Sequence, residues 1–166
     1  MALALGLSSA NGVAAESEQE AQDVVVLFLK TDPGLKQFFD NCAGYAVFPA
    51  VTKAAVGIGG AQGGGYVYEK NRLTGLAKLT QMTLGWSLGA QSYAELVFFE
   101  TNDALNQFKK NETVLSAQVG AVAAAQGASA KAKYQVGVAV FTISKNGLMF
   151  EASVGGQKFQ FTPQAR

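Results

Sequence analysis

The side chains that usually carry catalysis are scarce in this sequence. It contains no histidine, so the most common metal ligand and the most common general base at neutral pH are both missing. Its single cysteine, Cys42, falls on an apolar helical stripe, and we expect a buried structural thiol rather than a nucleophile. Glu95 and Glu151 fall inside predicted strands, where a carboxylate pair could serve glycoside hydrolysis. An outward-facing position or a salt bridge explains each glutamate more simply, so we predict no enzyme, no cofactor and no metal site.

Basic side chains offer a second kind of candidate site. Lys53 lies between Phe48-Pro49-Ala50 and a glycine-rich strand. Together with Lys70, Arg72 and Lys78 it could form a patch that takes a phosphate or a lipid head group. Ordinary solvated lysines are the alternative interpretation of the same residues.

The overall charge argues against nucleic acid as a partner. The formal net charge is +1, and arginine, which usually recognises bases and phosphates, occurs only at Arg72 and Arg166. The glycine run from Val56 to Tyr66 also fails as a nucleotide-binding loop. Gln62 stands where the dinucleotide fingerprint needs its third glycine, and no helical pattern follows. Period-two alternation around these glycines predicts strands instead.

Three helices are expected around those strands. Glu18–Lys30 carries an apolar stripe behind Ser17, a predicted N-cap. Asp32 is expected to cap a second helix that ends at Gly44, and Thr101 a short one through Lys110.

The remaining pattern predicts an α+β fold that is mainly antiparallel β. Lys70-Asn71 and Lys145-Asn146-Gly147 are predicted hairpin turns, and Ala123 to Ala132 a mobile loop. Apolar residues on both strand faces favour a small closed or nearly closed barrel of about eight or nine strands, or else a two-layer sheet. The expected strands are Tyr45–Phe48, Ala54–Gln62, Gly65–Glu69, Gly75–Thr83, Trp86–Gln91, Glu95–Glu100, Val114–Ala123, Tyr134–Ile143, Leu148–Val154 and Lys158–Thr162.

The first residues are typical of an export signal. Residues 1–15 combine an apolar stretch with a small-residue cleavage site, and we interpret them as a signal-peptide remnant before a single domain at 16–166. This predicts an exported, periplasmic protein; a disordered cytosolic tail is the alternative.

Phenylalanine is abundant, with 11 residues in 166. Phe28, Phe38, Phe39 and Phe48 gather where the helices meet the first strand. Core packing accounts for most of the phenylalanines, while a subset could line an acyl-chain cavity or enter a membrane interface.

Several short segments, taken in order, resemble the SYLF family, a lipid-binding domain of bacterial exported proteins and of eukaryotic actin-patch and membrane-trafficking proteins. They span about residues 20–162, and their order and spacing carry the resemblance. The segments are Cys42-Ala43-Gly44-Tyr45-Ala46-Val47-Phe48-Pro49, the glycine strand after Lys53, Leu84-Gly85-Trp86-Ser87-Leu88-Gly89-Ala90-Gln91 with the strand to Phe99, Asn102-Asp103-Ala104-Leu105-Asn106-Gln107-Phe108, and Lys145-Asn146-Gly147-Leu148-Met149-Phe150.

The resemblance implies binding to membrane phospholipids, with an N-terminal amphipathic helix contributing. We therefore predict a non-enzymatic lipid-binding module of the bacterial cell envelope, peripherally attached to a membrane. The alternative is a structural or protein-interaction barrel that supports the envelope without lipid affinity, as a homo-oligomer or with an envelope protein. The residues predicted to contact lipid are Lys53, Lys70, Arg72, Lys30, Lys36, Phe28, Phe38 and Phe39.

Overall fold

The computed structural model describes residues 17–56, 58–83, 91–116, 119–144 and 154–164, with the backbone alone at 53–56, 58, 59, 83 and 91. Several predictions fall outside these residues. They are the signal-peptide remnant at 1–15, the hairpin at 145–147, Glu151, and most of the strands expected at 86–91 and 148–154.

The described chain begins with helical segments, and two further helical segments interrupt the strands that follow. The helices are α1 (Glu18–Thr31), the 3-10 turn η1 (Pro33–Leu35), α2 (Lys36–Asn41), α3 (Asn102–Lys109) and the 3-10 turn η2 (Ala128–Lys131). The strands are β1 (Gly44–Val56), β2 (Ile58–Glu69), β3 (Arg72–Thr83), β4 (Gln91–Phe99), β5 (Ala121–Ala123), β6 (Val138–Ser144) and β7 (Lys158–Pro163).

The helix starts follow the capping residues that the sequence predicts. Ser17 Oγ accepts a hydrogen bond from the Glu20 backbone N–H at 3.1 Å, and Asp32 Oδ1 accepts one from Gly34 N–H at 3.2 Å. Thr101 Oγ1 caps α3 by accepting from Ala104 N–H at 3.1 Å. Each cap supplies an acceptor to a backbone N–H that has no partner within its helix. The predicted starts at Ser17 and Thr101 are confirmed, whereas Asp32 caps the 3-10 turn η1, and α2 begins at Lys36 without a side-chain cap and ends at Asn41, before the predicted end at Gly44.

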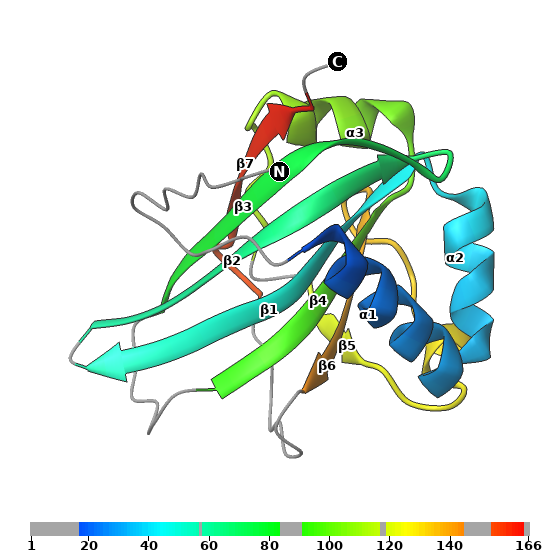
Figure 1. Cartoon of the computed structure of the whole chain (residues 1–166), viewed down its shortest axis with the longest axis horizontal. Coiled ribbons are helices and arrows are strands. Elements are labelled where there is room, and N and C mark those ends of the chain that lie inside the picture. The colour runs from blue at the N-terminus through cyan, green and yellow to red at the C-terminus, as the bar shows by residue number, and fades with distance from the viewer. Residues whose placement is uncertain (1–16, 57, 84–90, 117–118, 145–153, 165–166) are drawn as a thin grey trace, which may run out of the picture.

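The strands form one open sheet in the order β5-β6-β4-β1-β2-β3-β7 (Figure 1). Neighbouring strands are antiparallel, except that β5 and β6 are parallel. Within the described residues the two end strands, β5 and β7, do not pair with each other, so the predicted closed or nearly closed barrel is wrong. The strands are apolar on both faces because other elements pack on each face.

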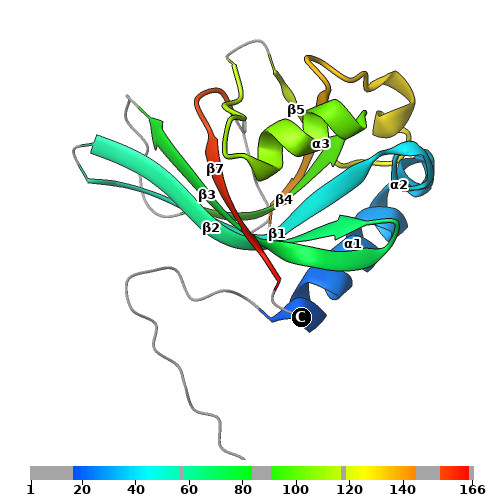
Figure 2. The ribbon, with the colours of Figure 1, turned by 90° about the horizontal axis from the view of Figure 1, so that it is seen from above.

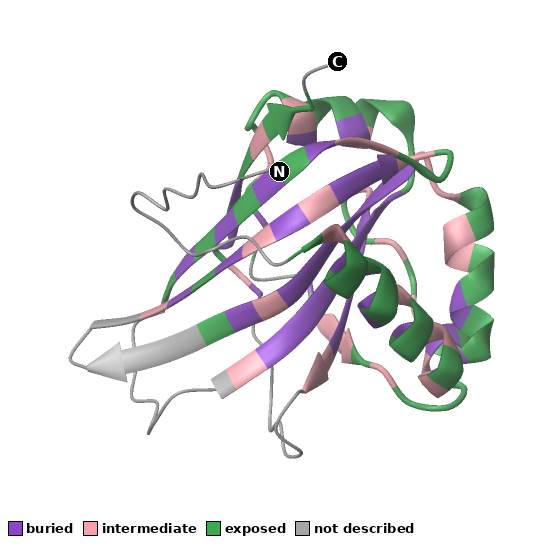
Figure 3. Ribbon diagram, in the orientation of Figure 1, coloured by how far each residue is buried: buried purple, intermediate pink, exposed green. Residues whose placement is uncertain are grey.

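The sheet has helices on both sides (Figure 2), and buried residues run along its strands (Figure 3). Each face carries its own apolar cluster. On β4, residues 94, 96 and 98 pack in the cluster that contains Val24 and Phe28 of α1. Residues 97 and 99, one position out of phase, pack with Leu105 and Phe108 of α3. We call these the α1 face and the α3 face. Figure 2 shows α1 and α3 on opposite sides of the sheet.

The first strands differ from the prediction at a proline. Tyr45–Phe48 extends into one strand that reaches Val56, and its register with β4 shifts between Phe48 and Val51. Pro49 sits at this irregularity, which is a position where a sheet tolerates the missing N–H. The expected strand at 54–62 is in fact the junction of β1 and β2, where Val56 pairs with Ile58. The alternating small residues of this segment have the pattern of a continuous strand, so the sequence did not indicate that one strand ends and the next begins there.

The segment after α3 also differs from expectation. The strand predicted at 114–123 is reduced to β5, although Val114 forms an isolated bridge with Lys158. The loop predicted from Ala123 to Ala132 contains η2, and Ser129 within it is buried.

The glycines of β2 have the structural role expected of them. A Cβ atom on Gly65 would lie 2.5 Å from Phe48 Cδ1 and 2.6 Å from the Val47 carbonyl oxygen. Real side chains do not tolerate such contacts, so glycine at position 65 lets the Phe48 ring lie against the sheet.

Candidate functional site

A groove of about 900 Å³ opens beside the turn between β2 and β3. Lys70 and Arg72 line it and are both exposed. An ammonium and a guanidinium together can bind a phosphate-sized anion, the first as a point charge and the second as a two-pronged donor. The remaining lining residues come from the link between α2 and β1, the hairpin, the start of α3, and the end of β7 with the residue after it. They are Ala43, Glu69, Leu73, Thr74, Asn102, Pro163 and Gln164.

The turn itself sets the position of these cations. Lys70 and Asn71 both have positive φ, 51° and 63°, which is the pattern of a type I′ hairpin turn. Glu69 pairs with Arg72 across the turn in the β2–β3 register. The predicted Lys70-Asn71 hairpin is confirmed, and it holds Lys70 and Arg72 at one end of the sheet.

The acidic residue in this groove is already paired. Glu69 forms an ion pair with Lys109 of α3, whose Nζ also lies 6.0 Å from the centre of the Phe161 ring. Within the described residues, Lys70 and Arg72 form no ion pair. The groove therefore keeps two positive charges that an anion can neutralise.

Lys53 does not belong to this groove. Its backbone pairs with Ala61 of β2, whereas Lys70 follows the far end of that strand. At the usual rise of a strand residue, positions 61 and 70 are separated by roughly 30 Å. Lys78 is exposed further along β3, opposite Gln160 of β7. The structure thus separates the predicted patch and leaves Lys70 and Arg72 together.

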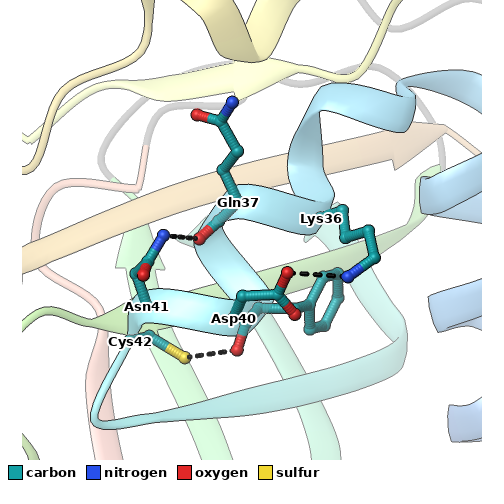
Figure 4. A network of polar contacts seen from close by, with 6 residues as sticks. Lys36, Gln37, Asp40, Asn41 and Cys42 are labelled. Atoms are coloured by element: carbon teal, nitrogen blue, oxygen red, sulfur yellow. Dashed lines mark hydrogen bonds and ion pairs between the residues drawn. The ribbon is translucent and has the colours of Figure 1, made fainter.

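The two helix lysines have different surroundings. Lys36 is exposed and its Nζ lies 2.7 Å from Asp40 Oδ2 on the next turn of α2 (Figure 4). Asn41 Nδ2 donates to the Gln37 carbonyl beside this pair at 2.8 Å. Lys30 is exposed at the end of α1 and has no ion pair among the described residues. Lys30 is therefore the helix lysine whose charge is uncompensated.

The helix phenylalanines pack into the protein. Phe28 has no exposed surface, and Phe38 and Phe39 are half-buried. The Phe38 ring centre lies 5.3 Å from that of Phe98 and 5.2 Å from that of Phe141, so it joins α2 to the α1 face of the sheet. The predicted lipid contact of Phe28 needs surface that this fold does not leave, because the apolar stripe of α1 faces the core.

Two other apolar side chains of α1 are available to a partner. Val26 and Leu27 are 50% and 43% exposed. The sequence did contain a signal for them, since the apolar run from Val24 to Leu29 is wider than one buried stripe. With Lys30 they give α1 an outer surface that is partly apolar and partly basic.

A polar cluster lies inside the α3 face, which the sequence interpretation missed. Glu95 of β4 has no exposed surface, and its Oε2 accepts a hydrogen bond from Gln157 Nε2 at 2.9 Å. The same nitrogen lies 3.3 Å from Gln81 Oε1, and Gln81 Nε2 donates to the Gly155 carbonyl at 3.0 Å. Glu95 has no ion pair among the described residues, so its predicted outward-facing or salt-bridged position is wrong.

Burial changes the acidity of this cluster. Loss of water raises the pKa of Glu95 to about 8, and the hydrogen bond from Gln157 offsets part of the shift. Burial and the charge of Glu95 raise the pKa of Tyr93, two residues earlier on the same strand. A signal was present in the sequence. Glu95 shares its strand face with Tyr93, Val97 and Phe99, and the other face of this strand is also apolar.

The remaining candidates carry little chemistry. Cys42 is half-buried, its Sγ lies 3.6 Å from the Phe39 carbonyl (Figure 4), and burial raises the pKa of the thiol to about 11. That setting disfavours the reactive thiolate. Within the described residues no three acidic or cysteine side chains gather as a metal site requires, and none of the described helices is long and apolar enough to cross a bilayer.

Comparison with known proteins finds two matches. The family model described as "Ysc84: Las17-binding protein actin regulator" matches residues 80–165. Beta cell expansion factor A of Aeromonas veronii is 29% identical over 142 residues, which is 84% of this chain. The chain spans about half of that relative, 53% of its length.

Proposed function

Since the chain belongs to the Ysc84 family, also known as SYLF, we propose that it is a non-enzymatic module that binds anionic phospholipid at a membrane surface. The observation that carries this proposal is the groove beside the β2–β3 turn. There Lys70 and Arg72 are exposed, and the acidic neighbour Glu69 is engaged by Lys109.

The groove suits a lipid phosphate in both charge and chemistry. Arg72 can donate two parallel hydrogen bonds to phosphate oxygens, while Lys70 adds a mobile positive charge. Each basic residue near an anionic bilayer contributes about 1 kcal/mol, so these two account for about 2 kcal/mol of salt-sensitive attraction. Val26 and Leu27 of α1, with Lys30 nearby in sequence, offer the apolar surface that interfacial binding also needs.

Charge reversal in the groove tests the proposal. The double variant Lys70→Glu and Arg72→Glu is mixed with vesicles that contain phosphatidylglycerol, and bound protein is measured by sedimentation. We expect an affinity loss of about 30-fold or more, because about 2 kcal/mol of attraction is removed and repulsion is added.

A matched control comes from the same chain. Lys131 and Lys133 are exposed and have the same spacing, and their reversal to glutamate changes the net charge equally. We expect the affinity of this control to stay within about threefold of that of the unaltered protein, because salt screens charges that lie far from the bound lipid. Equal losses in the two double variants would show that the groove is not the lipid-binding site.

Protein contact is the second candidate function, because of a smaller groove of about 290 Å³ beside α3. Val114 and Val136 line it and are 55% and 81% exposed, which is unusual for valine. Val136 also holds a positive φ of 53°, a strained conformation for a β-branched residue. Light scattering and pull-down with Val136→Ser test this function; an interaction that survives the variant would exclude Val136 from it.

The cellular location belongs to the proposal as well. The apolar and small residues at 3–15 support export to the bacterial envelope. Fractionation of the producing cell, with mass spectrometry of the mature N-terminus, tests it. Recovery in the cytoplasm with residues 1–15 intact would contradict export.

A further inference from the structure

The polar cluster at Glu95 contains two buried acceptors that lack a donor. They are Glu95 Oε1 and Gln157 Oε1, and neither has a hydrogen-bond partner. The other polar atoms of the same two groups, Glu95 Oε2 and Gln157 Nε2, are joined at 2.9 Å. A buried acceptor without a donor is costly, so two of them in one pair of side chains require an explanation.

One proton accounts for both acceptors. A carboxylic acid and a primary amide can form a cyclic pair, in which the amide N–H donates to one oxygen and the acid O–H donates to the amide oxygen. A proton on Glu95 Oε1 makes this atom a donor, and Gln157 Oε1 is the acceptor that the pair still needs. We propose that Glu95 keeps this proton at neutral pH, and that its acid–amide pair with Gln157 is a latch on the segment leading into β7.

The surroundings of Glu95 favour the neutral acid. Within the described residues no lysine or arginine reaches it, and its pKa is raised to about 8 by burial with no contribution from a charged group. The phenol of Tyr93, whose own pKa is raised, is the titratable neighbour, and it also lies within hydrogen-bonding reach of the Gln157 side chain. The side chains from the elements around it are uncharged, namely Phe48 opposite it on β1, Thr142 opposite it on β6, Gln81 of β3 and Gln157.

The latch connects the middle of the sheet to its edge. Gln157 lies just before β7, and its backbone carbonyl accepts from Leu115 N–H at 3.0 Å. Gly156 N–H donates to the Leu115 carbonyl at 2.6 Å, and Gln81 holds the Gly155 carbonyl at 3.0 Å. Leu115 in turn lines the smaller groove beside α3. Ionised Glu95 would be a buried charge with one donor, so its hydration requires the 154–157 segment to move away.

Two measurements test the latch on the whole chain. The first follows the carboxyl ¹³C resonance of Glu95 with pH, and we expect its midpoint near 8. The second compares backbone hydrogen exchange of Leu115 and Gly156 with that in Glu95→Gln at the same pH. The glutamine can donate where the acid O–H does and does not titrate, so this variant keeps the latch closed.

The ratio of the two exchange rates is the decisive quantity. We divide the exchange rate in the unaltered protein by the exchange rate in Glu95→Gln. Between pH 7 and pH 9 we expect this ratio to rise about tenfold, because Glu95 passes from mostly neutral to mostly charged. Glu112→Gln, which changes an exposed glutamate, serves as control and should follow the unaltered protein. A carboxyl midpoint near 4.5, or a ratio that does not change with pH, would overturn the proposal.

Discussion

Asp32 and Glu95 are both buried carboxyl groups, but the chain around them supplies hydrogen-bond donors very differently. Asp32 accepts from Gly34 N–H at 3.2 Å, from Ser129 Oγ at 2.9 Å and from Ser129 N–H at 2.7 Å, so both of its oxygens are engaged. Glu95 accepts one hydrogen bond, from Gln157. Donors reach both oxygens of Asp32, whereas one oxygen of Glu95 lacks a donor.

The difference follows from where the two residues sit in the backbone. Asp32 precedes η1, and Ser129 lies in η2, so backbone N–H groups at helical starts are free to donate. Glu95 lies inside β4, where neighbouring strands β1 and β6 use the backbone groups for the ladder. A buried acid in the middle of a sheet therefore depends on side chains alone, and here one amide is within reach.

The largest expected effect is a pH dependence of folding that comes from Glu95. Its folded pKa of about 8 is above its ordinary value of 4.5, so its contribution to stability is full below pH 4.5 and is lost as pH rises to 8. The free energy of unfolding should fall over this window by an amount on the order of a few kcal/mol. Urea denaturation at several pH values measures it, and Glu95→Gln should remove that slope. If the free energy of unfolding of Glu95→Gln still falls over this pH window, groups other than Glu95 cause the dependence.

The same chemical change at the two acids should have unequal effects. Asp32→Asn places an NH₂ group against donors, and we expect a loss of about 2–3 kcal/mol in the free energy of unfolding at pH 7. Glu95→Gln should instead raise the free energy of unfolding under the same conditions, by an amount on the order of a few kcal/mol, since the amide replaces the neutral acid and the folded state no longer has to take up a proton at pH 7. Chemical denaturation of both variants makes the comparison, which fails if both variants lose stability to the same extent.

A smaller effect is expected when one donor to Asp32 is removed. Ser129→Ala deletes the hydroxyl bond to Oδ1 but keeps the backbone N–H bond to Oδ2, so the loss should be about 1 kcal/mol. Thermal unfolding measures it against Ser116→Ala, which changes an exposed serine. If Ser129→Ala is as stable as that control, the η2 contact does not hold Asp32.

Local patterns predicted the local parts of this fold. The caps at Ser17, Asp32 and Thr101 and the Lys70-Asn71 turn depend on residues only a few positions apart, and the structure confirms them. Closure of the sheet could not be predicted this way. Apolar residues on both strand faces are equally expected for a barrel and for a sheet covered on each side, and only the packing of α1 and α3 distinguishes them.

Contacts between distant residues explain the missed parts of the candidate sites. Gln157 reaches Glu95 across 62 positions, and Ser129 reaches Asp32 across 97, with no repeating pattern to indicate either. The separation of Lys53 from Lys70 depends on the β1–β2 register, which follows from a turn that the sequence did not signal. Lys70 and Arg72 were found because their own hairpin keeps them together.

Vesicle binding by the unaltered chain tests the proposed function most directly. Protein is sedimented with phosphatidylglycerol vesicles and, separately, with phosphatidylcholine vesicles, at low and at high salt. We expect binding to the anionic vesicles that weakens as salt screens the cations of the groove, and little binding to the neutral ones. Absence of binding to phosphatidylglycerol, or equal and salt-independent binding to both lipids, would contradict it.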